Sequence, residues 1–472
     1  MKSRYFFFIA FFCLISIAFS QNSNNANFHE RYYHVISDSN YNYLLVSTIY
    51  YNDFEKTVGK CIKIDSHGNQ INDYIYEEED GNVYFFNIHF INNSYFIFGK
   101  ISKNNHNYLL TIQLNDHLEI IQTQKYSFPE NKGIAFLSSI FDSDSNFVFT
   151  GYGGENFTMF FYKIDQNCNS LFSKYFDSPL QTAYQIHESN DKSKYSIFLD
   201  GYLPHRQSGG ILEMSKTFDT ISFHLIETYT RHVSSSLKMS DSTFIVSSIN
   251  LLDDYKLYLN SVKHDGSVLH SDTFYKAIGM KELPAFSQGI SKNSDNYYYI
   301  GSSSNFDYSN SFFSSNDAWF HLIKVDENMN VLWEKWYGEN GYYSLNSVLG
   351  ILDGGCLMVG TKYLHSVENQ FFMGHYIKVD ANGNEEWTLD VEIPEWLYKV
   401  YPNPTQSVFN IENNEMDIQS VELFDISGKL LNSVQDCNNM TISIDLSSFS
   451  QGIYLAKIKS SKGIRTEKVV RN

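Results

Sequence analysis

Short apolar runs, each bounded by polar turn residues, recur along most of the chain. One run ends at Lys63-Ile64-Asp65 and is followed by the turn Ser66-His67-Gly68-Asn69. The same or a related tripeptide returns at intervals of 50, 50, 50, 50, 61 and 54 residues. Its seven copies begin at Lys63, Gln113, Lys163, Glu213, Lys263, Lys324 and Lys378. A period of this length predicts a repeat architecture instead of one globular core.

A second signature runs in step with the tripeptide. It is an apolar strand that ends in a small residue, as in Tyr95–Gly99 and Phe147–Gly151. The last repeat shows four short β segments, at Ser347–Leu352, Cys356–Gly360, Gly374–Val379 and Glu386–Val391. A four-stranded sheet cannot bury both of its faces alone, so neighbouring units must stack. We therefore predict an all-β protein in which residues 30–394 form a seven-bladed β-propeller. An open β-solenoid is the alternative, although its repeats are usually shorter and richer in Gly.

The repeat stops after Pro394 and a different pattern begins. Tyr401-Pro402-Asn403-Pro404 contains two prolines, which break a strand and suit an exposed turn. Alternating segments follow at Ser407–Glu412, Ser420–Asp425, Leu430–Val434, Thr441–Leu446, Ile453–Lys459 and Arg465–Val470. This pattern predicts a small Ig-like β-sandwich over residues 395–472.

The first 20 residues have the pattern of a secretory signal peptide. Lys2 and Arg4 precede an apolar core that runs from Phe6 to Phe19. We predict cleavage between Ser20 and Gln21, with residues 21–29 as a short linker. No later stretch has 18 consecutive apolar residues, so we expect no transmembrane helix.

Composition and charge narrow the range of partners. Aromatic residues make up 17% of the chain, with 35 Tyr and 38 Phe against only 7 Pro, which suits pleated, half-buried strands. The formal net charge is −18. Residues 396–472 contain eight Lys or Arg and eight Asp or Glu, so the acidity belongs to the repeats. Such a charge repels nucleic acid, and we expect no nucleic-acid partner.

The last 75 or so residues closely resemble the type A C-terminal sorting domain of the type IX secretion system. The resemblance rests on the ordered segments Tyr401-Pro402-Asn403-Pro404, Leu423–Lys429 with Gly428 and Lys429 in its turn, Ile444–Leu446, Gly452-Ile453-Tyr454, and Lys468–Val470. It implies export across the outer membrane by that machinery and removal of the tail by a surface sortase-like peptidase. Attachment to a surface lipopolysaccharide, or release, would follow. An ordinary Ig-like ligand-binding module is the alternative.

The sixth and seventh repeats resemble repeats of secreted proteins from Bacteroidetes-type bacteria. Trp333, Trp336 and Tyr337 follow one turn and Trp387 follows the next, beside Asp353-Gly354-Gly355. The resemblance implies a propeller but no particular activity. We expect these aromatic side chains to lie between blades and not to form a sugar-binding platform.

The cysteines show no metal-binding pattern. Cys61, Cys168, Cys356 and Cys437 are isolated, with no C-x-x-C motif and no His at metal-ligand spacing. We expect buried, reduced thiols, no metal site and no cofactor. A Cys61–Cys356 disulfide is an alternative, because the first and seventh blades would be neighbours in a closed ring.

No catalytic motif emerges from the sequence. G-x-S-x-G, H-E-x-x-H and P-loop patterns are all missing. Asp142–Asn146 and Asp380–Asn384 are similar to the start of a calcium loop, but Gly153 and Val391 stand where its bidentate Glu would be. We expect plain Asx turns there. Likewise, Glu77-Glu78-Glu79-Asp80 is interpreted as a hydrated charge run.

Three functions remain open for the repeats. We favour a surface-exposed binding module for an unknown glycan or protein ligand, without catalytic residues. An envelope-directed or glycan-directed hydrolase or lyase, with paired carboxylates at the channel mouth, is the runner-up. A structural component of the cell surface is the third.

Overall fold

The computed structural model describes most of the chain after residue 27. The described ranges are 28–51, 56–104, 106–127, 134–153, 158–176, 182–200, 209–227, 231–240, 242–250, 253–310, 314–365, 372–390, 399–412, 418–425, 429–435, 441–460 and 463–472. Within them lie 36 strands and no helix. The chain divides into two compact units, Met1–Val391 and Glu392–Asn472.

The described part of the first unit contains seven sheets, each made from strands that follow one another along the chain. The first three are β1–β4 (Phe28–Ser37, Tyr43–Tyr51, Lys56–Ile64, Gln70–Tyr76), β5–β8 (Asn82–Ile91, Ser94–Lys103, His106–Leu114, Ile120–Ser127) and β9–β12 (Ile134–Phe141, Asn146–Gly153, Thr158–Asp165, Ser170–Phe176). The fourth and fifth are β13–β16 (Thr182–Glu188, Lys194–Asp200, Gly210–Ser215, Thr220–Leu225) and β17–β20 (Arg231–Lys238, Thr243–Asn250, Lys256–Lys263, Val268–Phe274).

The sixth sheet has a divided first strand. Its strands are β21–β25 (Glu282–Pro284, Ile290–Lys292, Tyr298–Ser304, Trp319–Val325, Val331–Tyr337), and both β21 and β22 pair with β23. The seventh sheet is β26–β29 (Tyr342–Gly350, Cys356–Tyr363, Phe372–Val379, Glu385–Asp390). The four segments predicted from the last repeat are therefore present, with bounds that differ from the expected ones by up to five residues.

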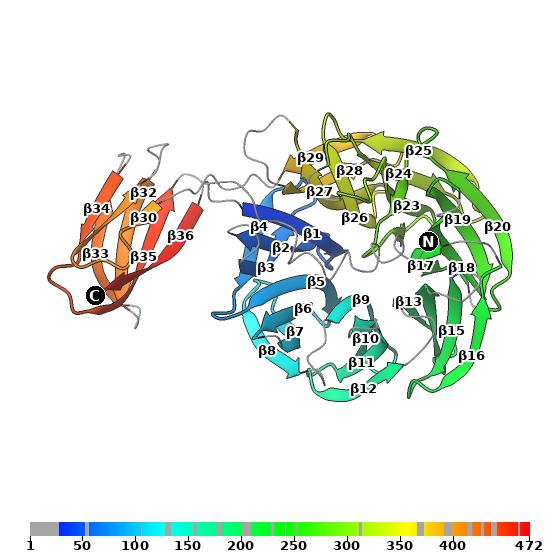
Figure 1. Ribbon diagram of the computed structural model, residues 1–472, viewed down its shortest axis with the longest axis horizontal. Helices are drawn as coiled ribbons and strands as arrows, with labels where there is room; N and C mark the ends of the chain where they lie inside the picture. The colour runs from blue at the N-terminus through cyan, green and yellow to red at the C-terminus, as the bar shows by residue number, and fades with distance from the viewer. Residues whose placement is uncertain are drawn as a thin grey trace. The chain divides into compact units, whose positions relative to one another are not determined.

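The seven sheets surround a common centre, with the first strand of each sheet innermost (Figure 1). Each sheet packs against the next along the chain, and β27 and β28 of the last sheet pack against β1 of the first. One buried apolar cluster lies at each of these junctions. Burial of apolar area between neighbouring sheets is thus the main force that holds the unit together.

The junction between the last and first sheets is closely packed. Tyr32 is fully buried, and its ring lies so close to Gly374 that a Cβ atom there would be 2.0 Å from it. The indole N–H of Trp387 donates to the carbonyl of Ser66 at 3.3 Å. Trp333 makes the same kind of bond to Ala381 at 3.1 Å, from the sixth sheet to the seventh. These two tryptophans lie between sheets, as predicted.

The Asp of the tripeptide closes the turn that follows the third strand. Asp65 Oδ1 accepts the backbone N–H groups of His67 and Asn69, both at 2.8 Å. Asp165, Asp326 and Asp380 close their turns in the same way. Asp142 does so in a turn between first and second strands. These are Asx turns, so both calcium-loop candidates have a structural explanation.

The Lys of the tripeptide joins neighbouring sheets. Lys163 Nζ lies 3.0 Å from the carboxylate of Asp142 in its own sheet and 3.2 Å from the hydroxyl of Tyr195 in the next. That hydroxyl donates to Asp142 at 2.6 Å. Lys63, Asp38 and Tyr95 repeat the arrangement between the first and second sheets. The repeated Lys is therefore a buried cation that links two sheets, not a surface charge.

One copy of the tripeptide is out of phase. The turn of the fifth sheet begins at Lys263, whose N–H donates to Ser267, whereas the corresponding turn of the first sheet begins at Asp65. Lys263-His264-Asp265 thus lies inside a turn, and Ser261 takes the position of the linking Lys. The prediction that Lys263 is equivalent to Lys63 was therefore wrong. Asp265 stands at the third position of the turn, where its Oδ1 accepts the Ser267 N–H at 3.0 Å.

The three described cysteines are buried and free. Cys61 packs between the first and second sheets, and Cys356 packs between the sixth and seventh. The Cys61–Cys356 disulfide is therefore absent, because the two thiols belong to different junctions. Cys168 occupies the fourth position of its turn, with a φ of 60° and its side chain buried. Cys437 lies outside the described residues.

The second unit is a β-sandwich of two sheets. One contains β30 (Lys399–Tyr401), β31 (Val408–Glu412) and β34 (Thr441–Asp445). The other contains, in spatial order, β33 (Leu430–Gln435), β32 (Ile418–Asp425), β35 (Gly452–Ser460) and β36 (Gly463–Arg471). Residues from both sheets share one apolar core, including Phe409, Ile444, Leu423 and Ile458. Across the described ranges, no helix is long and apolar enough to cross a membrane.

The buried linkage predicts a large effect of one Lys substitution. Lys163→Met should lower the free energy of unfolding by about 2–3 kcal/mol, because it removes the nearer of the two cations of the buried Asp142 carboxylate and leaves Lys216 at 3.7 Å. Lys263→Met, in the copy that lies within a turn, should change it by less than about 0.5 kcal/mol. Urea unfolding of both variants measures the difference, and equal effects would contradict the assigned roles.

Candidate functional site

The sorting-motif residues of the tail converge at one end of its sandwich. Asn403 Oδ1 accepts the N–H of Val470 at 2.9 Å. The Thr405 N–H donates to the Val470 carbonyl at 2.8 Å, and the Asn472 N–H donates to the Thr405 carbonyl at 2.9 Å. The Tyr401-Pro402-Asn403-Pro404 turn is thus attached to the last strand, more than 60 residues further along the chain.

The other motif segments reach the same end through strand register. Gly452 and Tyr454 at the start of β35 pair with Arg471 and Val469 at the end of β36. Tyr454 also pairs with Asp425 at the end of β32. Asp425 Oδ1 in turn accepts the N–H of Lys429 at 3.0 Å. We call these grouped segments (residues 401–407, 425, 429, 450–454 and 469–472) the motif end.

The motif end lies opposite the end at which the chain joins the sandwich. β30 runs antiparallel to β31, with Lys399 beside Glu412 and Tyr401 beside Asn410. The first residue of β30 therefore lies at the far end, and Tyr401 brings the chain to the motif end. Gly428 is outside the described residues, as is the side chain of Lys468. Ser20 and Gln21, the predicted cleavage site, also lie outside them.

The inner strands of the first unit share a β-bulge. A one-residue register shift interrupts the first strand of six sheets, at Tyr33, Phe86, Leu137, Tyr184, Ser234 and Asn346. The residue after each bulge is polar and more than nine-tenths buried in every case. We call these six residues the axis layer: His34, Asn87, Ser138, Gln185, Ser235 and Ser347.

The sixth sheet supplies the segment that crosses the centre of this layer. Between β21 and β22, the Ser287 N–H donates to Asn346, and the Val348 N–H donates to Gln288. Gln185 of the fourth sheet reaches the Ser287 carbonyl at 3.5 Å. Gln288 forms a hydrogen bond with the His34 ring of the first sheet. The segment thus contacts the first and fourth sheets, which are not neighbours of the sixth, and this places it at the ring axis.

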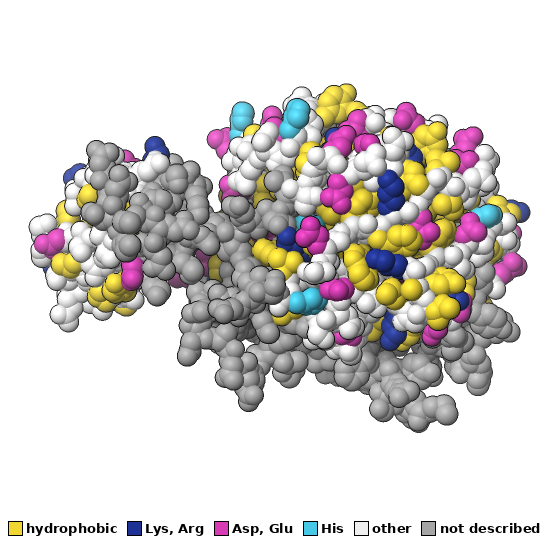
Figure 2. Space-filling model, turned by 90° about the horizontal axis from the view of Figure 1, so that it is seen from above, with side chains coloured by type: hydrophobic (Ala, Val, Ile, Leu, Met, Phe, Trp, Pro, Cys, Tyr) yellow, Lys and Arg dark blue, Asp and Glu magenta, His cyan; other side chains and the backbone are white. Residues whose placement is uncertain are grey.

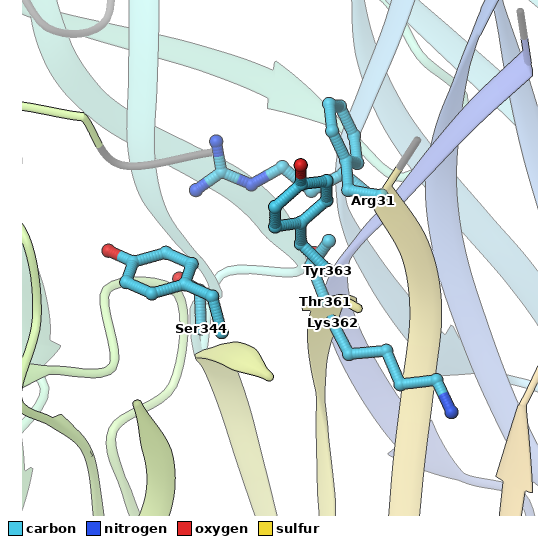
Figure 3. A pocket seen from close by; sticks show the side chains of 7 residues that line it. Arg31, Ser344, Thr361, Lys362 and Tyr363 are labelled. Atoms are coloured by element: carbon cyan, nitrogen blue, oxygen red, sulfur yellow. The ribbon is translucent and has the colours of Figure 1, made fainter. Parts of the chain in front are cut away.

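A small pocket lies at the end of the ring where second and third strands connect. Its lining includes Tyr363 at the end of β27 and Phe372 at the start of β28, together with Arg31, Thr361 and Ser344. The cavity volume is about 10 Å³, which is the space for one water molecule. In Figure 3, the Arg31 guanidinium and the Tyr363 ring lie close together, whereas the Lys362 side chain points away. Asn346 accepts from Arg31 at 3.2 Å.

A buried charged cluster lies between the fifth and sixth sheets. His321 Nδ1 lies 3.0 Å from Glu282 and its Nε2 lies 2.9 Å from Glu334. The Ser302 hydroxyl donates to Glu282 at 2.8 Å. Burial by itself lowers the pKa of His321, but the two carboxylates outweigh burial and raise it to about 9. His321, Glu282 and Ser302 are fully buried, so this Ser–His–Glu group meets no substrate and serves as a structural ion pair.

The cluster has a counterpart in the first sheet. Ser47 donates to Glu30 at 2.7 Å, and Lys60 lies 3.5 Å from the same carboxylate. Sequence reasoning missed both clusters because their members are 13 to 39 residues apart. The available signal was a charged or polar residue inside an otherwise apolar strand, as with His321 in Trp319–Val325.

The outermost strands carry exposed aliphatic residues. The second residue of that strand is about half exposed in six sheets, at Ile71, Ile121, Leu171, Ile221, Leu269 and Leu332. On the side of the ring seen in Figure 2, apolar side chains are interleaved with Lys, Arg, Asp and Glu. No group of three or more His, Cys, Asp or Glu in the described ranges could hold a metal ion.

Comparison with known families identifies the tail. Residues 399–472 match the family described as "Secretion system C-terminal sorting domain". The chain is therefore an exported all-β protein that reaches the cell surface or the medium. Its tail is a type IX sorting domain, as predicted, so it addresses the protein to the type IX secretion machinery.

The other comparisons are less informative. The chain is similar to a solved structure titled "Structure of Dos1 propeller", at 11% identity and a TM-score of 0.42, over 75% of this chain and 78% of that one. A search of curated proteins gives no match.

The buried cluster predicts a pH-dependent stability. The folded pKa of His321 is raised from 6.5 to about 9, so its stabilisation is complete below pH 6.5 and is lost as the pH rises through 9. His321→Gln should remove about 3 kcal/mol of this alkaline decline in the free energy of unfolding. Urea unfolding between pH 6 and 10 measures it, with His365→Gln, at a partly exposed ion pair, as the control. An unchanged decline in His321→Gln would contradict the assignment.

Proposed function

We propose that the protein is an exported seven-bladed β-propeller that serves as a binding module at the cell surface. The observation that carries the proposal is the difference between the two ends of the ring. One end is closed by short turns. In these turns Asp side chains accept hydrogen bonds from backbone N–H groups. The other holds the Arg31 pocket and the connections between second and third strands. Ligands usually bind to loops positioned by a rigid scaffold, which favours the second end.

The axis geometry favours binding on this end instead of inside a channel. The crossing segment at Ser287 and Gln288 lies at the axis, between the first, fourth and seventh sheets. Phe306, Tyr342, Tyr363 and Phe372 belong to one buried aromatic cluster at this end. These buried side chains hold the framework of this end, and the connections between second and third strands would contact a glycan or a protein ligand.

The runner-up, a hydrolase or lyase, would need a carboxyl group with a raised pKa at this end. Wherever the pKa of a described carboxyl group is clearly shifted, it is lowered, as for Asp142, Asp307 and Asp380. For Asp142 and Asp307, burial by itself would raise the pKa. Hydrogen bonds that favour the ionised carboxylate outweigh burial and lower the pKa. These charges have structural roles, which supports the binding module over the enzyme.

The tail, in this proposal, is an Ig-like domain that the export machinery recognises at its motif end. The sequence motifs are far apart in the chain, and hydrogen bonds and register bring them to one surface. After a signal peptidase cleaves between Ser20 and Gln21, the machinery moves the folded protein across the outer membrane. A sortase-like peptidase then removes the tail, and the remaining residues 21–394 are attached to lipopolysaccharide or released.

Asn403→Ala tests recognition by a composite surface. It removes the acceptor of the Val470 N–H, which contributes about 1 kcal/mol locally, and so loosens the Pro402–Pro404 turn where it meets β36. We expect a severalfold drop in surface protein and accumulation in the periplasm, measured by cell fractionation. Asn432→Ala, at an exposed position of β33, is the matched control and should be exported normally. Normal export of Asn403→Ala would contradict the composite surface.

Arg31→Ala tests the binding end. The purified mature protein should bind isolated envelope polysaccharide or envelope protein saturably, without releasing new reducing ends or peptides. Arg31→Ala should weaken binding about tenfold, because loss of the buried Arg31–Asn346 hydrogen bond loosens the framework of this end. Lys335→Ala, beside a turn at the closed end, should leave the affinity unchanged. Release of reducing ends or peptides by the wild-type protein would support the hydrolase or lyase. Equal affinities of Arg31→Ala and Lys335→Ala would show that the ligand binds elsewhere.

A further inference from the structure

The junctions between sheets differ in how closely the sheets approach. At the junction of the third and fourth sheets, the inner strand β13 packs against β9, β10 and β11. Besides the Lys163 linkage, Lys174 of the third sheet lies 3.1 Å from Asp219 of the fourth. The Ser143 N–H donates to Glu188 at 3.0 Å across the same junction. Strands β9–β16 therefore form a tightly joined pair of sheets, which we call the two-sheet segment.

The two-sheet segment meets its neighbours on both sides through phenylalanine rings. Towards the second sheet, the rings of Phe147 and Phe149 lie 5.0 Å and 4.6 Å from the Phe98 ring, centre to centre. Here the inner strands β5 and β9 supply the main backbone contact. Towards the fifth sheet, the Phe198 ring lies 5.0 Å from the Phe244 ring. Because aromatic rings occupy the space between the sheets, side chains hold these two flanking junctions more than closely packed backbones do.

One histidine–serine hydrogen bond crosses each flanking junction. His89 Nε2 of the second sheet lies 2.7 Å from Ser139 Oγ of the third. His187 Nε2 of the fourth sheet lies 2.8 Å from Ser236 Oγ of the fifth. The two pairs are equivalent, because each His stands three residues after the bulge of its inner strand and each Ser stands two residues after its own. The same bond thus closes the two-sheet segment on both sides.

The surroundings of both histidines disfavour the protonated ring. Both are half-buried, and each is flanked by two phenylalanine rings. Burial, with a contribution from His34 on β1, lowers the pKa of His89 to about 3. Burial, with a contribution from Lys238 on β17, lowers the pKa of His187 to about 4. Glu188, next to His187 in β13, accepts from the third sheet instead. The titratable groups that act on the two rings are therefore bases, which oppose a second positive charge.

We propose that the two-sheet segment separates from the rest of the ring as one unit in acid, when both flanking junctions open. Since both histidines have a lowered pKa in the closed ring, the closed form is fully favoured above pH 6.5 and loses stability as the pH falls towards 4. The junction inside the segment keeps its ion pairs over this range, because hydrogen bonds outweigh burial and lower the pKa of Asp142. This acid response is independent of any ligand on the outer surface.

Three buried thiols report on different junctions. Cys168 belongs to the apolar cluster between the second and third sheets, Cys61 to that between the first and second, and Cys356 to that between the sixth and seventh. A pyridyl disulfide reacts with thiols in acid, and mass spectrometry of peptides from the mature full-length protein then gives each labelling rate. Relative to the unfolded chain at the same pH, Cys168 should react about 100-fold faster at pH 5 than at pH 7.5, about tenfold for each histidine. Cys61 and Cys356 should stay protected.

His187→Gln distinguishes the opening of one unit from local loosening. Glutamine can still bond to Ser236 but does not titrate, so the acid response of Cys168 should fall to about tenfold, although Cys168 lies at the other flanking junction. His89→Gln should give the same reduction, and His270→Gln, at an exposed pair on β20, should keep the full response. Equal labelling of all three thiols in acid, no acid response in the wild type, or an unchanged response in His187→Gln would overturn the proposal.

Discussion

The fold depends on one constraint: no four-stranded sheet in this chain can bury both of its faces alone. Each sheet therefore needs two neighbours, and the last must meet the first. Apolar clusters supply most of the stabilisation at these junctions. Polar side chains complete some of them, as where Lys163 contacts Asp142 of its own sheet and Tyr195 of the next. A charge buried in such a place must be paired, so these links specify which faces meet.

Much of this architecture could be predicted from the sequence. The period of the Lys–apolar–Asp tripeptide indicated the seven units, and Asp65 and its equivalents do close the turns. The tripeptide could not show where each copy lies relative to its turn. Lys263 has the expected neighbours in sequence, but it lies at the start of the turn and not in the strand before it. The longer interval before Lys324 also held information. It reflects an interrupted first strand, whose crossing segment at Ser287 and Gln288 reaches across the axis to other sheets.

The candidate sites depend on contacts that no local pattern reveals. The sorting roles of Asn403, Tyr454 and Lys429 stay predictions from the sequence motifs, and the grouping of these residues follows from the register of β32, β35 and β36. The Glu282–His321 pair and the axis layer likewise require knowledge of which strands are neighbours. Expectations for Ser20, Gln21, Gly428 and Cys437 remain predictions, since these residues lie outside the described ranges.

The two units divide the work of the protein: the sorting domain determines where it goes, and the ring determines what it does there. Deletion of Tyr401–Asn472 tests this division most directly. Cell fractionation with protease protection should find the truncated protein folded in the periplasm, with its ring resistant to proteolysis and absent from the surface. Continued appearance of the truncated protein at the cell surface would contradict the account.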